Sequence, residues 1–311
     1  MKTVDVIIPT YKPTGKLKRI ISMLERQTYP VEHIILINTE EKYFNTFFYG
    51  STFLEQYHNL VIRHISKYEF DHGGTRRMAV GLSHADYFIC MTDDAVPEDK
   101  YLVQNLLKPL LEGKAVVSYG RQLAGRHCSE MEYFTRKFNY PKESKIKTKK
   151  NLEDMGIKAF FCSNVCAAYD RRIYDKLGGF IKHTIFNEDM IFAYHVLMAD
   201  YSIAYAADAR VVHYHRYSNL QQLKRNFDLG VSQADHPEIF GKISSSAEGK
   251  KLVLETAAFL RKNKKAGQIP GLFLTSFYKY LGYRLGKAYK KLPRSLVRKL
   301  TMNENYWKKE A

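Results

Sequence analysis

Short apolar runs alternate with segments of helical spacing in the first half of the chain. The apolar runs are residues 4–8, 33–38, 60–65 and 86–92. Residues 15–27 and 73–85 carry apolar side chains at helical spacing, and the second segment opens on paired glycines. Strands that alternate with helices predict a mostly parallel sheet with helices on both faces. We therefore expect an α/β fold, with Pro9 ending the first strand.

The second half predicts a less regular arrangement. A strand is expected at 114–123, and 136–156 is polar, lysine-rich and without apolar periodicity, which predicts a surface excursion. Residues 160–180 predict a strand, a helix and a Gly-Gly turn, and a helix should begin near Glu188. Two strands are expected at 202–206 and 210–214, and the rest from Leu220 is helical. We expect a catalytic domain at 1–230 and a helical, basic region at 231–311.

Polar side chains follow the apolar runs where the strands should end. In parallel α/β sheets, ligands bind outside the carboxyl ends of the strands. That rule brings Pro9-Thr10-Tyr11, Asn38-Thr39 and Asp93-Asp94 to one edge. The two carboxylates of "TDDAVP" would suit Mg²⁺ or Mn²⁺. A turn that caps a helix starting near Pro97 explains them equally well.

Two later motifs also carry candidate chemistry. In "FNEDMIFAYHV", Glu188 and Asp189 start an apolar helix, with Asn187 available as its cap. They are either charges that complement the helix dipole or a general base for an acceptor hydroxyl. In "RVVHYHRYS", His213 and His215 share one face of an extended segment beside Arg216, and could complete a metal shell or grip a diphosphate. "DHGGTRR" at 71–77 suits a phosphate contact.

The net charge of +17 is concentrated at the end of the chain. Residues 242–311 hold 17 Lys and Arg against four acidic residues, a balance of +13 that leaves +4 for the first 241 residues. Because the positive charge lies outside the α/β region and no recognition motif is present, we do not expect nucleic-acid binding. A basic, aromatic helical tail favours either an anionic membrane surface or packing on the catalytic domain or a second subunit of a homodimer.

The cysteines and the N-terminus predict a cytoplasmic location. The chain has four cysteines without a C-x-x-C pair, which predicts buried thiols in a reducing compartment. The run Val4–Ile8 is interrupted by Asp5 and ends at Pro9, so it does not read as a signal peptide. No stretch approaches the roughly 20 apolar residues of a membrane span.

The order of these motifs resembles the family-two glycosyltransferases of the GT-A fold. The resemblance covers residues 1 to about 230, from the Pro-Thr-Tyr strand end through the acidic pair and Asn-Glu-Asp to His-x-His. Within that family, "MTDDAVP", "CSNVCAAYDRR", "LGGF", "FNEDMIFAYHV" and "RVVHYHRYSNLQQLKRNFDLGV" look like bacterial rhamnosyltransferases that build cell-surface polysaccharides, such as those of streptococcal rhamnan synthesis.

The resemblance implies roles for individual residues. Asp189 is the expected base, with Glu188 beside it. The expected metal ligands are Asp94, Asp93 and His215. The acceptor is expected to be flanked by Ser163, Asn164 and Asn187. The nucleotide sugar is expected to contact Pro9, Thr10, Tyr11, Asn38, Asp71, His72, Gly74, Arg76, Asp93 and Arg216. Thr92 stands where the family's Asp-x-Asp motif has its first acid, which makes Asp94 the better-placed ligand.

The activity implied is inverting transfer of L-rhamnose from dTDP-L-rhamnose, with Mn²⁺ or Mg²⁺, to a lipid-linked glycan. The enzyme is then peripheral at the inner face of the cell membrane. A base ionised near neutral pH requires no unusual pKa. A UDP-hexose donor, or a metal-dependent nucleotidyltransferase or hydrolase on a similar sheet, is the alternative.

Overall fold

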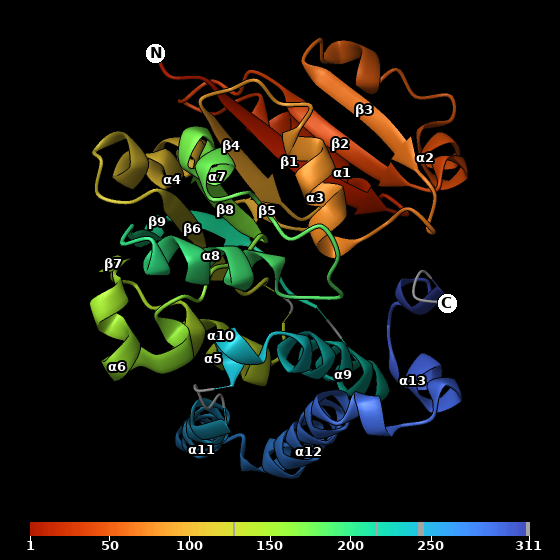
Figure 1. Cartoon of the computed structure of the whole chain (residues 1–311), viewed down its shortest axis with the longest axis vertical. Helices are drawn as coiled ribbons and strands as arrows, with labels where there is room; N and C mark the ends of the chain where they lie inside the picture. Colours follow the sequence, from red (N-terminus) through yellow and green to blue (C-terminus); the bar gives the residue numbers. More distant parts are fainter. Residues whose placement is uncertain (127, 216, 242–245, 309–311) are drawn as a thin grey trace.

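A single mixed sheet forms the centre of the molecule (Figure 1). The structure is a computed structural model that describes residues 1–126, 128–215, 217–241 and 246–308. Eight strands follow the order β3-β2-β1-β4-β8-β6-β9-β5, and β7 pairs with β9. Their bounds are β1 Val4–Tyr11, β2 Ile34–Thr39, β3 Leu60–Ile65, β4 Tyr87–Met91, β5 Val96–Pro97, β6 Val117–Leu123, β7 Lys145–Lys147, β8 Cys166–Asp170 and β9 Ile203–Val212.

The sheet is mostly parallel, as the alternating pattern predicts. The strands β3, β2, β1 and β4 run parallel, and β6 runs parallel to β9. β8 lies between β4 and β6 and is antiparallel to both. The residues that precede β8 therefore lie at the same edge as the carboxyl end of β4, where the Thr92 N–H reaches the Val165 carbonyl.

Helices cover both faces of the sheet. Their bounds are α1 Gly15–Leu24, α2 Glu41–Phe48, α3 His72–Val80, α4 Leu102–Leu111, α5 Glu130–Asn139, α6 Leu152–Met155, α7 Arg171–Lys176, α8 Glu188–Met198, α9 Asn219–Asp235, α10 Pro237–Phe240, α11 Ser246–Lys262, α12 Ile269–Lys287 and α13 Arg294–Leu300. Successive residues of β1 alternate between two cores: Val6 and Ile8 pack with α1 and α4, and Ile7 with α3 and α8.

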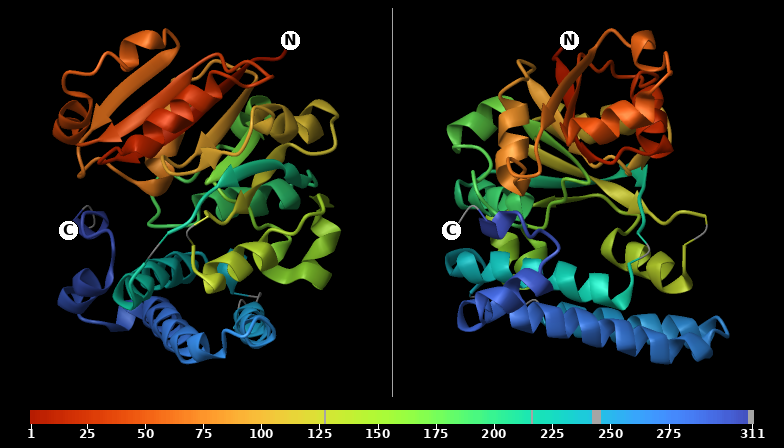
Figure 2. Two further views of the ribbon diagram at one scale, coloured as in Figure 1. Left: turned by 180° about the vertical axis from the view of Figure 1, so that it is seen from behind. Right: turned by 90° about the vertical axis from the view of Figure 1, so that its right-hand side faces the viewer.

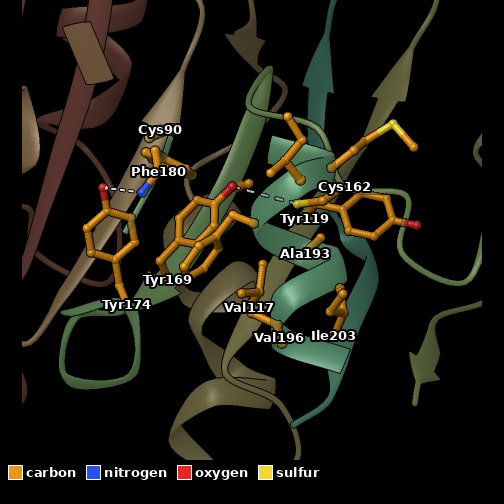
Figure 3. Packing of buried hydrophobic residues seen from close by; sticks show 14 of the residues in the cluster. Cys90, Val117, Tyr119, Cys162, Tyr169, Tyr174, Phe180, Ala193, Val196 and Ile203 are labelled. Carbon is orange, nitrogen blue, oxygen red and sulfur yellow. Dashed lines mark hydrogen bonds between the residues drawn. The ribbon is translucent and has the colours of Figure 1, made fainter. Parts of the chain in front are cut away.

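Aromatic rings fill the core between the sheet and α8 (Figure 3). Phe88 of β4 stacks on Tyr169 of β8 at 5.0 Å between ring centroids, and Tyr169 is fully buried. The Tyr174 hydroxyl accepts a hydrogen bond from the Phe180 N–H at 3.0 Å. These contacts hold the turn after α7 against the sheet and thus fix where the following segment enters α8.

Four details differ from the expectation. First, β1 continues through Pro9 to Tyr11. Backbone N–H groups alternate between the two sides of a strand, and the Val6 N–H points to β2. The backbone nitrogen of Pro9, three residues later, therefore points to the β4 side, where the last pair between β1 and β4 is Ile7 with Cys90. Proline's missing donor is therefore not needed there.

Second, the acidic pair is followed by the two-residue strand β5, and the next helix, α4, starts at Leu102 rather than near Pro97.

Third, the polar stretch 136–156 is more ordered than its composition predicts. It contains the end of α5, the strand β7 and the short α6. Lys147 of β7 is buried, and its ammonium group donates to the carbonyls of Lys158 and Phe161. Fourth, the two strands expected at 202–206 and 210–214 are one strand, β9, whose register against β6 shifts between Gly120 and Arg121.

Helices α11 and α12 form a layer on the side of α9 away from the sheet (Figures 1 and 2). The expected boundary at residue 230 lies within α9, and the division into two domains stays a prediction. Helices α9 and α12 touch backbone to backbone at three glycines. A Cβ on Gly282 or Gly286 of α12 would collide with the carbonyls of Leu223 and Phe227 in α9, and one on Gly230 would lie 2.5 Å from the Tyr283 carbonyl.

This close contact makes the glycines sensitive to substitution. We predict that Gly286→Val lowers the midpoint of thermal unfolding, because its side chain would force the two helices apart at a cost of about 1–3 kcal/mol. Gly271→Ala, in the same helix but with no atom within 4 Å of its added Cβ, is the control and should keep or raise the midpoint. Equal midpoints for the two variants in differential scanning calorimetry would contradict the tight contact.

Candidate active site

Two consecutive carboxylates at the start of α8 form the first part of the site. The Glu188 Oε1 lies 3.0 Å from Nη1 of Arg76 in α3, and both side chains are buried. The Asn164 Nδ2 also donates to this oxygen, at 3.0 Å. Burial opposes ionisation of Glu188, but the charges of Arg76 and His72 nevertheless hold its pKa below the ordinary value. Glu188 is therefore a fixed, ionised partner of Arg76.

Asp189 has a different environment. Its carboxylate accepts hydrogen bonds from the backbone N–H groups of Asn164, at 2.9 Å, and Met190, at 2.8 Å, and the residue stays partly exposed. Burial and the neighbouring Glu188 charge raise its pKa to about 7. A base here was expected to require no unusual pKa. The pKa of Asp189 is nevertheless raised, because two neighbouring carboxylates share a poorly solvated site.

Asn164 joins the two carboxylates through different groups. Its backbone N–H donates to Asp189, and its amide nitrogen donates to Glu188. Its amide oxygen accepts from the Tyr169 hydroxyl of the aromatic core at 2.7 Å. Asn187 does not cap α8 with its side chain, contrary to expectation. Its backbone is left-handed, with φ of 65°, and its Nδ2 donates instead to Ser232 Oγ of α9 at 3.1 Å.

A second cluster lies at the carboxyl end of β4, where Asp94 meets two histidines that follow β9. His213 Nε2 is 3.4 Å from Asp94 Oδ1, and His215 Nδ1 is 3.5 Å from Asp94 Oδ2. One ligand atom from each of the three residues falls within 4.8 Å of the others. The structure therefore brings together Asp94 and both histidines of the expected His-x-His pair, His213 as well as the favoured His215.

The tautomer of His213 follows from its other neighbour. His213 Nδ1 lies 2.9 Å from the Gln122 Oε1 in β6, and that oxygen also accepts from Arg136 Nη1. An amide oxygen can only accept, so Nδ1 carries the proton and Nε2 presents its lone pair to Asp94 and His215. Burial lowers the pKa of both His213 and His215, which keeps the imidazoles neutral. Neutral imidazole is the metal-binding form.

Asp93 points elsewhere. Its Oδ2 accepts from Thr10 Oγ1 of β1 at 2.7 Å, and burial raises its pKa to about 6. Asp93 is not one of the three converging side chains, so its expected metal contact stays a prediction. Thr92, in place of the first acid of the family motif, donates through Oγ1 to Asp94 Oδ1 at 2.9 Å and so orients the remaining ligand.

The donor set fits a divalent transition metal better than Mg²⁺. Mg²⁺ prefers oxygen ligands in octahedral geometry, whereas imidazole nitrogen is a ligand of transition metals, and carboxylate oxygen suits Mn²⁺ as well as Mg²⁺. The Gln122 contact to His213 has the form of the outer hydrogen bonds that orient histidine ligands in metalloproteins.

Cations from three helices surround this cluster. Arg225 of α9 lies over the Phe186 ring, at 4.8 Å, and near the Tyr217 ring, which stacks on His215 at 4.8 Å. The charges of Arg225, Arg136 and Lys16 also help to lower the pKa of His213 and His215. Converging cations beside a metal-binding cluster can hold a diphosphate.

A hydrogen-bonded chain links the two clusters. Gln122 accepts from His213 and donates through Nε2 to Ser163 Oγ at 3.1 Å. The next residue, Asn164, binds Asp189. Gln122, Arg136 and Arg225 were not expected as site residues. Gln122 and Arg136 lie in no local motif, and the motif at residues 210–231 that contains Arg225 indicates no role for it, because the partners of all three are distant in the chain.

The other expected nucleotide contacts have partners within the protein. Asp71 caps α3 by accepting from the N–H groups of Gly73 and Gly74, and it pairs with His183 at 2.7 Å. A Cβ on Gly74 would lie 2.6 Å from the Lys182 carbonyl, so the glycine permits close packing of that loop. His72 is flanked by the rings of Phe70 and Phe186.

At the ends of the first two strands, Asn38 contacts His64 Nδ1 at 2.9 Å, and Tyr11, which follows Pro9 and Thr10, is 40% exposed. Arg216 lies outside the described residues. Contact of all these residues with a nucleotide stays a prediction.

Comparison with known proteins identifies the family. A family profile described as glycosyl transferase family 2 matches residues 5–178. The chain belongs to glycosyltransferase family 2. It is 36% identical to the O-antigen chain rhamnosyltransferase WbaN of Salmonella anatum, over 99% of this chain and 96% of the relative. It is 35% identical to the O-antigen chain rhamnosyltransferase RfbN of Salmonella typhimurium, over 98% of this chain and 96% of the relative. This glycosyltransferase therefore resembles its relatives along nearly its whole length.

Solved structures show the same GT-A fold. The mannosyltransferase PcManGT from Pyrobaculum calidifontis, in complex with GDP-Man and Mn²⁺, superposes with a TM-score of 0.56 at 14% identity, over 99% of this chain and 86% of that one. S. aureus TarS 1-349 gives a TM-score of 0.51 at 14% identity, over 93% and 91%. The GT-A fold expected from the sequence is confirmed. In the described part of the glycosyltransferase, no helix is both long and apolar enough to span a membrane.

The raised pKa of Asp189 makes stability depend on pH. Because the pKa is about 7 in the folded protein and has an ordinary value of 3.8, the folded state binds more protons, and Asp189 lowers stability as pH rises from about 4 to about 7. Asp189→Asn removes this titration. The melting temperature of Asp189→Asn minus that of the wild type should therefore increase from pH 5 to pH 8. Asp175→Asn, at a half-exposed site, is the control, and equal differences at both pH values would contradict the assignment.

Proposed function

We propose that this glycosyltransferase transfers L-rhamnose from dTDP-L-rhamnose to a lipid-linked glycan, with inversion at the anomeric carbon. Both relatives matched over nearly their full length are named O-antigen chain rhamnosyltransferases, which supports the sugar and a polysaccharide acceptor. A lipid-linked acceptor would be reached at the cytoplasmic face of the membrane, with the enzyme bound peripherally.

The observation that carries the mechanism is the chain Asp94–His213–Gln122–Ser163 and, one residue on, Asn164–Asp189. This chain of contacts joins Asp94 and the two histidines to a partly exposed carboxylate, which supports a donor site and an acceptor site side by side. The donor diphosphate would lie at the first cluster, with Mn²⁺ or Mg²⁺ held by Asp94, His213 and His215, and Asp93 close by. The acceptor would lie beside Asp189, flanked by Ser163, Asn164 and Asn187.

Asp189 acts as the base in this proposal. As the acceptor oxygen bonds to the anomeric carbon, the bond from that carbon to the diphosphate oxygen breaks, and the acceptor's hydroxyl proton passes to the Asp189 carboxylate. A pKa near 7 suits this transfer. A carboxylate with a higher pKa is a stronger base, and one whose pKa lies near the working pH is still ionised in a large fraction of the molecules. Direct attack on the donor, with the protein only accepting a proton, inverts the anomeric centre.

Negative charge grows on the leaving nucleoside diphosphate. Arg225, Arg136 and Lys16 converge where it would lie, and fixed cations in a poorly solvated site stabilise such charge. A bound divalent cation would supply Lewis-acid stabilisation of the same oxygens. Glu188 positions Asp189 through its charge and its contact with Asn164.

Thr10, Tyr11 and Asn38, at the carboxyl ends of the first two strands, would line the nucleoside pocket with Asp71, His72, Gly74 and Arg76. Arg216 is proposed as a further diphosphate contact from the sequence alone.

The donor is the part of the proposal most open to test. The GT-A neighbours were solved with different donors, GDP-Man in PcManGT and UDP-GlcNAc in TarS, so this fold does not select one nucleotide sugar. Thermal-shift titration against dTDP-L-rhamnose, UDP-hexoses and GDP-mannose, with and without Mn²⁺, separates them. We expect stabilisation by dTDP-L-rhamnose with Mn²⁺, and stabilisation only by UDP-hexoses would overturn the rhamnose assignment.

The base assignment predicts separate effects on binding and turnover. Asp189→Asn should keep the Kd for the donor within a few-fold and lower kcat by about 10²–10⁴-fold, because only proton transfer is lost. The wild-type rate should fall as pH drops below about 7. Asp175→Asn should turn over normally. An Asp189→Asn enzyme that keeps wild-type kcat would exclude Asp189 as the base.

The metal assignment can be tested without activity. His213→Gln and His215→Gln should each weaken Mn²⁺ binding at least about tenfold in calorimetric titration, and Gln122→Leu, which removes the partner of His213 Nδ1, about 10–100-fold. His64→Gln, which replaces a histidine at another strand end, serves as the control. If all four proteins bind Mn²⁺ as the wild type does, the metal lies elsewhere.

A further inference from the structure

Helix α12 exposes a row of large apolar side chains on its outer face. Phe273, Leu274, Phe277 and Tyr280 are each between 51% and 57% exposed, and their spacing puts them on one side of the helix. Its opposite side holds Gly282 and Gly286, which touch α9. Figure 2 shows α12 along the outer edge of the molecule, beyond α9. We call Phe273, Leu274, Phe277 and Tyr280 the α12 face.

Basic residues stand at both ends of the α12 face. Arg261 and Lys262 end α11, Lys264 and Lys265 follow in the connection to α12, and all four are exposed. At the other end, Arg284 continues the same row of the helix, one turn after Tyr280, and its Nη1 donates to the Tyr280 hydroxyl at 3.0 Å. Lys290 and Lys291 follow and are exposed. An apolar centre with cationic ends is the pattern of a helix that lies in the plane of an anionic membrane surface.

We propose that the α12 face docks on the surface of an anionic lipid bilayer. The aromatic and leucine side chains enter the boundary between headgroups and acyl chains, and the flanking Arg and Lys residues contact lipid phosphates. Helix α12 lies on the bilayer and does not cross it, in agreement with its lack of a sufficiently long apolar stretch. The inference rests on the proposed function only for the identity of the lipid-linked acceptor.

A second copy of the chain is a poorer occupant. Residues 242–311 carry 17 Lys and Arg against four acidic residues. An isologous dimer through the α12 face would bring two such regions together, and like charges in an interface disfavour association. A surface of opposite charge removes this repulsion and still buries the exposed rings.

The docked orientation brings the active site to the lipid surface. Helix α9 lies between α12 and the site, since Arg225 of α9 contacts the rings beside His215, and Leu223 and Phe227 of α9 touch the α12 glycines. Packed helices are separated by about 8–10 Å between axes. The distance from the bilayer to the site is thus about two helix layers, within the reach of a sugar chain attached to a membrane lipid.

Vesicle sedimentation tests the proposal with the full chain. The probe is vesicles of phosphatidylcholine with about one third phosphatidylglycerol at low salt. We expect the wild type to sediment with them, to dissociate in high salt or on pure phosphatidylcholine vesicles, and the Phe273→Ser/Phe277→Ser variant to bind at least about tenfold more weakly. Arg284→Glu should weaken binding in the same direction. Tyr49→Ser, at a ring that is 91% exposed after α2, is the matched control and should bind normally.

Two further measurements separate the possible failures. Circular dichroism and thermal melting of each variant show that the exposed substitutions leave the fold intact, and transfer to a water-soluble acceptor should be unchanged in Phe273→Ser/Phe277→Ser. The lipid assignment is overturned if the wild type does not bind anionic vesicles. It is also overturned if the wild type forms a dimer that dissociates in the Phe273→Ser/Phe277→Ser variant. Vesicle binding without transfer from any nucleotide sugar would leave the docking proposal standing and refute the proposed function.

Discussion

The buried ion pair between Arg76 and Glu188 is the constraint on which the active site depends. Two adjacent carboxylates cannot both stay ionised in a poorly solvated place without a cation, and breaking such a pair leaves an uncompensated buried charge. Arg76 comes from α3, whose first turn packs against residues 181–182 through Gly73 and Gly74. The packing of α3 on that loop thus determines which of the two acids is fixed as an anion and which, Asp189, is left near its titration point.

The parts of the fold that the sequence predicts well are those held by apolar burial. β2 and β4 were expected within a few residues, because each is a continuous, buried apolar run between two helical layers. The edge strand β3 was also expected, although Arg63 and His64 interrupt its apolar run. β5 and β7 were missed. They are two and three residues long and depend on pairing with β9, a partner distant in the chain. The polar composition around β7 does not predict a strand. Burial of Lys147 there depends on hydrogen bonds to distant residues, such as that to the Lys158 carbonyl, which exist only in the folded protein.

The site residues that the sequence predicts are likewise those in local motifs, and the residues it does not predict depend on distant partners. Asp94, His215 and the Glu188-Asp189 pair lie in local motifs, and the structure places them at two clusters on one edge of the sheet. Gln122 lies in no such motif, and the motif at residues 210–231 that contains Arg225 indicates no role for it. Their roles arise from contacts with His213 and with the rings beside His215. Asp93 shows the converse: adjacent acids look equivalent in sequence, yet a hydrogen bond from Thr10 turns one of them toward β1.

The glycine contact between α9 and α12 has a mechanical consequence. Where two helices touch through side chains, rotamer changes can absorb small displacements, but backbone in contact with backbone leaves no deformable layer. The two helices should therefore move as one rigid body. Since α9 carries Arg225 on its other side, a displacement applied to the outer surface of α12 would reach the groups around His215 almost undiminished.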